Sequence, residues 1–210
     1  MKKNCTEVVF VLDRSGSMCG LEKDTIGGFN SLINKQKKQD GEVLVSTVLF
    51  NDSSVVIHDR KPIDEVRLMT NKDYEVYGCT ALLDALGSSI CHIGNIHKYA
   101  RVEDVPEHTM FVIITDGMEN ASRYYSKERV KSMIEYEKEK YGWEFLFLAA
   151  NMDAIDTASQ YGIDKDHAVN YQCDSVGTRL NYEVLDEAIQ CICSGVPLSK
   201  SWKSKIEKRK

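Results

Sequence analysis

The sequence lacks any apolar run long enough to cross a membrane. The apolar run that ends at Asp13 is too short for the core of a signal peptide, and no small-residue cleavage site follows it. We therefore expect a cytoplasmic protein that has no membrane partner. The sequence also lacks Gly-x-x-x-x-Gly-Lys, Gly-x-Gly-x-x-Gly and Gly-x-Ser-x-Gly. These absences argue against a P-loop, a dinucleotide-binding turn and a serine-hydrolase elbow.

Paired cysteines are also missing. The seven cysteines form an odd set without a Cys-x-x-Cys pair, and Cys191 and Cys193 fall two apart in a helical pattern, where they face different ways. The five histidines show no His-x-x-x-His or His-Glu spacing. This pattern argues against a zinc site and a disulfide scaffold, and favours reduced thiols.

The net charge of −5 gives no sign of nucleic-acid binding, but the charge is unevenly distributed. Residues 198–210 hold six Lys or Arg and one Glu, a charge of +5, which leaves −10 for residues 1–197. We expect a domain over 1–197 and a basic tail over 198–210. The tail could contact an acidic partner, but a frayed, solvated terminus is the simpler interpretation. Beyond Trp202, it lacks the interleaved aromatic residues of a protein that binds single-stranded RNA.

Four apolar runs predict buried strands, since each is short, rich in branched or aromatic residues and not alternating. They are 8–12, 43–50, 110–114 and 145–150. A weaker stretch, 53–58 followed by 63–68, predicts an antiparallel edge hairpin, and 167–171 predicts another short strand.

Helical spacing fills the intervals between these strands. Apolar stripes lie within 21–33, 82–96, 130–134 and 180–192, and 153–161 predicts a short further helix. Ser126 is expected to cap the third helix, and capping is also the expected role of Asn151 and Asp153. The alternation predicts one α/β domain of Rossmann-like type. Its doubly wound, mostly parallel sheet would have one antiparallel edge strand and helices on both faces.

Two of the predicted strands end in an aspartate, Asp13 and Asp116. In such a sheet, sites lie beyond the carboxyl ends of the strands. After Asp13 come Ser15 and Ser17, and Gly16 between them allows a tight loop in which both hydroxyls face the same side. Hydroxyls with one or two carboxylates suit a hard cation such as Mg²⁺.

The pattern Asp13-x-Ser15-x-Ser17 resembles the signature of the von Willebrand factor A family, whose metal-ion-dependent adhesion site begins with Asp-x-Ser-x-Ser. Thr80, at the start of a predicted helix, and Asp116, in Thr-Asp-Gly, match two further elements of that site. The resemblance covers roughly residues 5 to 193. One departure is Cys79, which stands where the family commonly has a second glycine.

Segments 117–126 and 142–145 look most like stand-alone intracellular bacterial members of this family. The resemblance implies that Ser15, Ser17 and Thr80 bind the metal directly. Asp13 and Asp116 would hold metal-bound waters or approach the ion themselves. The cation would be Mg²⁺, with Mn²⁺ and Ca²⁺ left open, and an acidic residue of a partner protein would complete its coordination.

Aromatic, basic and thioether side chains flank the predicted site in two loops. Tyr, Met and Arg are enriched in interfaces, so these side chains are candidates for a rim that contacts the partner. The candidates are Tyr77, Met118, Arg123 and Tyr124. The alternative is that half of the aromatic residues in these loops, which include Tyr74 and Tyr125, pack beneath their own loops.

The rival interpretation is an enzyme in which Asp13 is the nucleophile of an Mg²⁺-dependent phosphoryl transfer. Phosphatases of that design usually carry a second carboxylate two residues further on as the acid/base, and Ser15 occupies that position here. We therefore expect a protein-binding module without catalytic activity or a small-molecule substrate.

Overall fold

Six strands form one sheet in the order β3-β2-β1-β4-β5-β6 in the computed structural model, which describes residues 1–209. The strands are β1 (Lys2–Asp13), β2 (Glu42–Phe50), β3 (Ser54–Pro62), β4 (Pro106–Thr115), β5 (Glu144–Ala149) and β6 (Ala168–Asn170). All neighbours pair in parallel except β2 and β3. The predicted mostly parallel sheet with one antiparallel edge strand is therefore confirmed.

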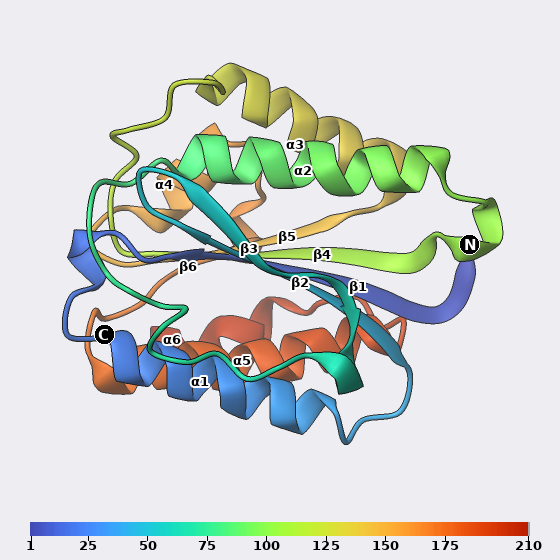
Figure 1. Ribbon diagram of the computed structural model, residues 1–210, viewed down its shortest axis with the longest axis horizontal. Helices are drawn as coiled ribbons and strands as arrows, with labels where there is room; N and C mark the ends of the chain where they lie inside the picture. Colours follow the sequence, from blue (N-terminus) through green and yellow to red (C-terminus); the bar gives the residue numbers. More distant parts are fainter. Residues whose placement is uncertain (210) are drawn as a thin grey trace.

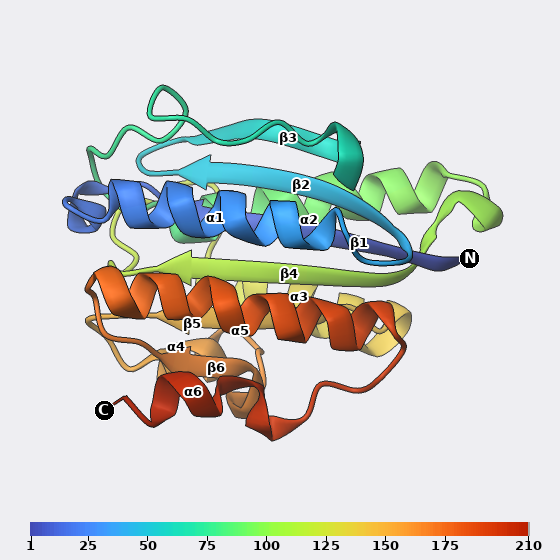
Figure 2. The same cartoon turned by 90° about the horizontal axis from the view of Figure 1, so that it is seen from below.

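Helices cover both faces of the sheet (Figures 1 and 2). One face carries α2 (Leu82–Tyr99), α3 (Lys127–Tyr141) and α4 (Ala154–Gln160). The other carries α1 (Glu22–Gln36), α5 (Ser175–Cys193) and α6 (Ser204–Glu207). Over residues 1–209, no helix combines the length and the apolar character needed to cross a membrane.

The core has two layers, one on each side of the sheet. Along β1, Val8, Phe10 and Leu12 pack on the side of α1 and α5, while Val9 and Val11 pack on the side of α2. Alternate side chains of a strand point to opposite faces, so a strand covered by helices on both faces is apolar throughout. This explains the continuous apolar runs in the sequence.

Two of the three predicted caps are confirmed. The hydroxyl of Ser126 accepts a hydrogen bond from the backbone N–H of Arg129, and the Asp153 carboxylate accepts from the N–H groups of Ile155 and Asp156 in the first turn of α4. Asn151 instead has a left-handed backbone, with φ of 55°, and its side-chain amide lies 3.5 Å from Asp116 Oδ2. The prediction that Asn151 caps a helix was therefore wrong.

The prediction that 63–68 forms the second strand of the edge hairpin is also wrong. Residues 63–65 form a 3-10 helix, and the chain then continues without a strand, burying Val66 and Met69. The side chain of Asn30 donates to the carbonyl of Met69 at 2.9 Å and accepts from its N–H at 2.8 Å. A side chain of α1 thus satisfies the backbone groups that a strand partner would otherwise bind.

Residues 198–209 of the predicted tail are ordered rather than frayed, contrary to expectation, and Lys210 lies outside the described residues. Trp202 and Ile206 are buried four residues apart, and the Trp202 indole donates to the carbonyl of Asp166. The ammonium of Lys203 donates to the carbonyls of Lys165 and Ala168, both at 2.8 Å. Apolar residues at i and i+4 anchor this basic segment beside β6. Besides the two carbonyls, the Lys203 ammonium lies 3.7 Å from Glu207 Oε1.

Candidate metal centre

The loop after β1 brings together the first three candidate ligands. The backbone N–H of Ser15 donates to Asp13 Oδ1 at 2.7 Å, and the Oγ atoms of Ser15 and Ser17 lie 3.0 Å apart. Asp13 and Ser15 are buried, whereas Ser17 is exposed. The two hydroxyls therefore face the same side of the loop, as Gly16 was expected to allow.

Thr80 approaches these hydroxyls from a second loop. Its Oγ1 donates to Ser15 Oγ at 3.1 Å, and its backbone N–H donates to the side chain of Asn120 at 2.9 Å. The two loops are joined where Gly16 N–H donates to the carbonyl of Gly78 at 3.0 Å. Thr80 does not cap α2, whose first helical residue is Leu82 and whose N-cap residue, Ala81, has no side-chain cap.

Gly78 and Cys79 determine the shape of this second loop. Gly78 has φ of 78°, and a Cβ there would lie 2.0 Å from Asp52 Oδ2. The Asp52 carboxylate accepts a hydrogen bond from the N–H of Cys79 at 3.1 Å. The thiol of Cys79 is exposed, so the loop accommodates a cysteine where the resembling family commonly has glycine.

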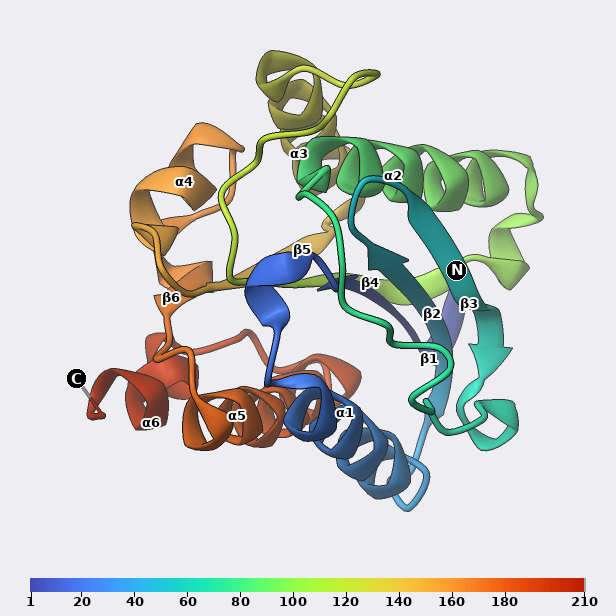
Figure 3. The same ribbon diagram turned by 60° about the vertical axis from the view of Figure 1, so that its left-hand side comes forward.

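Asp116 lies behind the hydroxyls, directly after β4. Its Oδ2 accepts from the thiol of Cys173 at 2.7 Å, while its Oδ1 is buried without a hydrogen-bond partner among residues 1–209. A Cβ on Gly117 would lie 2.7 Å from Thr80 Oγ1 and 3.0 Å from Ser17 Oγ. The glycine therefore leaves open the space beside the three hydroxyls. Figure 3 shows the loops that carry these residues, after β1, before α2 and after β4, at the same end of the sheet.

The electrostatics of the candidate ligands favour a cation. Burial raises the pKa of the Asp13 carboxyl, hydrogen bonds from Thr115 and Ser15 oppose the shift, and nearby Asp116 adds to it. Thr115 Oγ1 donates to Asp13 Oδ2 at 2.6 Å. A bound divalent ion would offset the burial of both carboxylates and would give Asp116 Oδ1 an interaction. The oxygen donors therefore fit a hard cation.

The donor set differs from a carboxylate or thiolate cage. Within residues 1–209, no group of three or more His, Cys, Asp or Glu side chains is arranged to hold a metal ion. A cation at this position would depend on the hydroxyls of Ser15, Ser17 and Thr80, with Asp13 and Asp116 behind them. With few direct carboxylates, such an ion would retain net positive charge.

The side chains of the two loops that flank the site are partly exposed and partly packed. Tyr77, Met118, Arg123 and Tyr124 are exposed. Tyr74 is buried and donates a hydrogen bond to the backbone carbonyl of Asp13. Tyr125 packs its ring against Gly87 of α2. The packing interpretation thus holds for Tyr74 and Tyr125, while the four candidates for the rim are accessible at the surface.

The contacts of Asn120 with Thr80 and of Asn151 with Asp116 were not predicted, and neither were three others. Thr115 and Cys173 bind the two carboxylates, and the Tyr74 hydroxyl binds the backbone at Asp13. The position of Thr115, directly before Asp116, was a signal that the sequence offered. Cys173 follows the weak strand β6, whose carboxyl end lies on the same sheet edge as that of β4.

Comparisons with known proteins bear on the fold. No family model matches the sequence, and no curated protein is significantly similar to it. Among solved structures, the chain is similar to the von Willebrand factor domain of the type V pili tip protein Mfa5 from Porphyromonas gingivalis, with a TM-score of 0.66 and 11% identity over 92% of this chain and 97% of that one.

Two further structures are similar to the chain over less than half of their own length. Proximal thread matrix protein 1 from the mussel byssus, with a zinc-occupied MIDAS motif, has a TM-score of 0.59 and 15% identity over 92% of this chain and 47% of that one. A von Willebrand factor type A protein from Catenulispora acidiphila has a TM-score of 0.56 and 13% identity over 89% and 42%. The chain therefore has the von Willebrand factor A fold.

Proposed function

We propose that this chain is a metal-dependent protein-binding module. Ser15, Ser17 and Thr80 would bind a divalent cation, with Asp13 and Asp116 acting through water or directly. The observation that supports this proposal best is the convergence of three hydroxyls, each within 3.1 Å of the next, on the open space beside Gly117. We propose Mg²⁺ as the ion, with Mn²⁺ and Ca²⁺ as substitutes. Zinc at the corresponding motif of the mussel protein supports a divalent ion.

The partner would be a protein that offers an acidic residue. A cation held mainly by neutral hydroxyls keeps positive charge and can accept a partner carboxylate as a ligand. That contact is far stronger than in water if surrounding side chains exclude solvent. Tyr77, Met118, Arg123 and Tyr124 are exposed on the loops around the candidate site and would form the excluding rim.

We propose a cytoplasmic location, as in stand-alone bacterial members of the family that the motif resembles. The absence of disulfides among the seven cysteines supports it, since persistent disulfides belong to oxidising compartments. Fractionation of the source cells, with blotting of the soluble and surface fractions, would test this assignment.

We propose no catalytic role for the site. Both carboxylate oxygens of Asp13 accept hydrogen bonds, from the Ser15 N–H and the Thr115 hydroxyl, which lowers their reactivity as a nucleophile. The position that an aspartyl phosphatase uses for its acid/base is Ser15. Metal-dependent phosphatase turnover that is lost in Asp13→Ala would favour the rival enzyme.

The test of the protein-binding proposal compares partner binding in Mg²⁺ and in EDTA. The immobilised full chain should retain a partner in Mg²⁺ and release it in EDTA. Thr80→Ala should weaken retention strongly while the domain stays folded, because it removes one ligand from a loop above an intact core. A partner that binds equally in EDTA, and equally to Thr80→Ala, would contradict the proposal.

A further inference from the structure

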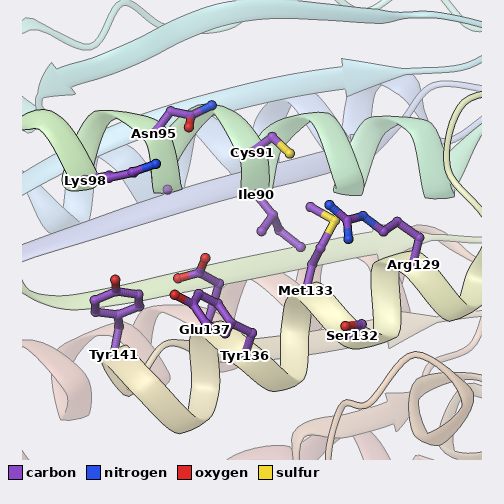
Figure 4. Close-up of a pocket in the computed structure, with 11 residues that line it drawn as sticks. Ile90, Cys91, Asn95, Lys98, Arg129, Ser132, Met133, Tyr136, Glu137 and Tyr141 are labelled. Carbon is purple, nitrogen blue, oxygen red and sulfur yellow. The ribbon is translucent and has the colours of Figure 1, made fainter.

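Two adjoining cavities lie at the opposite end of α2 from the candidate metal centre. The first, of about 340 Å³, runs between α2 and α3 (Figure 4). The second, of about 300 Å³, lies under the end of α2 and has Trp143, Val105 and Pro106 in its wall. Both include Glu137 and Gly94 in their lining. Their volumes lie at the small end of the range for small-molecule sites.

Glu137 is a buried carboxylate at the junction of these cavities. The residue is 8% exposed, and its Oε2 has no hydrogen-bond partner among residues 1–209. Its side chain points from α3 toward α2 (Figure 4), where a Cβ on Gly94 would lie 3.3 Å from Oε1. The missing side chain at Gly94 therefore makes room for the carboxylate. A buried acceptor without a donor destabilises the fold, and more so when it is charged.

The cationic side chains around Glu137 do not supply that donor. His97 uses its Nε2 to contact Glu7 Oε2 at 2.6 Å. Lys98 is exposed, and its ammonium lies over the ring of Tyr99, 5.1 Å from the ring centroid. Arg129 lies at the other end of the first cavity (Figure 4). Glu107 also lines the second cavity and adds negative charge.

We propose that these cavities bind a small organic amine, whose ammonium pairs with Glu137 and whose apolar body lies beside Trp143. An ammonium group has three donors and no acceptor, so it matches a carboxylate that lacks a donor. Trp143 lines the second cavity, and its ring is held from behind by the buried Phe111, with the ring centroids 5.4 Å apart. An aromatic side chain held in this way suits a flat apolar body. An acidic ligand would bring its charge against Glu137 and Glu107.

The test uses three probes that share an indole ring and differ in charge: tryptamine, the neutral tryptophol and indole-3-acetate. Each is titrated into the purified full chain. Binding is followed by calorimetry and by changes in the backbone amide chemical shifts of the protein. We expect saturable binding of tryptamine and weaker binding of the other two. Glu137→Gln should weaken tryptamine binding about tenfold or more, because it removes a charged hydrogen-bond acceptor. Glu139→Gln, an exposed substitution on the same helix, should leave binding unchanged.

A second variant covers the case in which Glu137→Gln fails to fold. Gly94→Ala places a methyl group beside Glu137 Oε1 and improves the helix propensity of α2, so it should weaken tryptamine binding without unfolding the domain. The proposal is overturned if tryptamine shows no saturable binding, if it binds no better than tryptophol, or if indole-3-acetate binds best. Unchanged tryptamine binding in a folded Glu137→Gln or Gly94→Ala variant would also overturn it.

Discussion

The thiol of Cys173 lies 2.7 Å from Oδ2 of Asp116 and donates a hydrogen bond to it. Burial and the neighbouring Asp116 carboxylate raise the pKa of this thiol to about 12, so it is protonated at neutral pH. The contact restrains one oxygen of Asp116, while the other, Oδ1, has no hydrogen-bond partner among residues 1–209. Cys173 is thus a positioning residue for a carboxylate of the candidate metal centre.

Removal of this hydrogen bond should weaken metal binding. Loss of a residue that orients a metal ligand typically costs about 10-fold or more in affinity, so we expect a loss of this size in Cys173→Ala. Cys173→Ser, which keeps a donor, should retain most of the affinity. Calorimetric titration with Mn²⁺ measures both, with Cys191→Ala on α5 as the matched cysteine control. Equal affinities of Cys173→Ala and the unchanged chain would show that the thiol does not orient Asp116.

Tyr124 should contribute to partner binding without affecting the metal. The residue is 85% exposed, while its backbone N–H donates to Asp84 Oδ1 at 2.9 Å. The loop should therefore keep its shape in Tyr124→Ala, and we expect partner affinity to fall about tenfold with unchanged Mn²⁺ affinity.

Tyr99→Ala is the matched control for this substitution, because Tyr99 is 79% exposed at the far end of α2. Surface plasmon resonance in Mg²⁺ compares the three proteins. If both tyrosine variants bind the partner as the unchanged chain does, Tyr124 lies outside the interface.

The free energy of unfolding should depend on pH through Asp73, which lies next to Tyr74 in the loop before Thr80. Both nitrogens of the Arg67 fork donate to Asp73, at 2.7 and 2.8 Å, and Thr70 donates from its N–H and its hydroxyl. The hydrogen bonds from Arg67 hold the pKa of this carboxyl well below its usual range. A lowered folded-state pKa contributes stability above the unfolded pKa of about 3.9, and this contribution is lost as the pH falls through the folded pKa.

Asp73→Asn should consequently lower the free energy of unfolding by about 1 kcal/mol at neutral pH. The expected loss is no larger because the Arg67 side chain is half exposed and solvent screens the ion pair. The difference from the unchanged chain should shrink as the pH falls below about 4. Denaturant unfolding at several pH values measures it, and Asp64→Asn, at an exposed position in the same segment, is the control. A stability difference that does not vary with pH would refute this role of Asp73.

The sequence was sufficient to predict the sheet and the proximity of the candidate ligands. Strands buried on both faces are apolar throughout, and parallel strands end at one edge, so Asp13 and Asp116 had to lie near each other. Gly16 between Ser15 and Ser17 indicated a tight loop. These inferences depend only on local pattern and on the handedness of parallel connections.

Contacts between distant segments could not be predicted in this way. The strand predicted over 63–68 is absent because Asn30, on α1, satisfies the backbone of Met69, and no local pattern reveals that pairing. The C-terminal segment is ordered because Trp202 and Ile206 find a buried surface beside β6. The Glu137 carboxylate is buried without a hydrogen-bond donor because α2 packs against α3, and the sequence does not show this packing.

The most direct test of the central claim is calorimetric titration of the purified chain and of Asp13→Ala with Mn²⁺. Burial already disfavours the charged Asp13 carboxylate, so the alanine variant should fold, and circular dichroism with thermal unfolding checks that it does. Asp40→Ala, an exposed substitution in the turn after α1, is the control. We predict that the unchanged chain and Asp40→Ala each bind one Mn²⁺ and that a folded Asp13→Ala binds none. Equal Mn²⁺ binding by all three proteins would contradict a metal centre at the carboxyl end of β1.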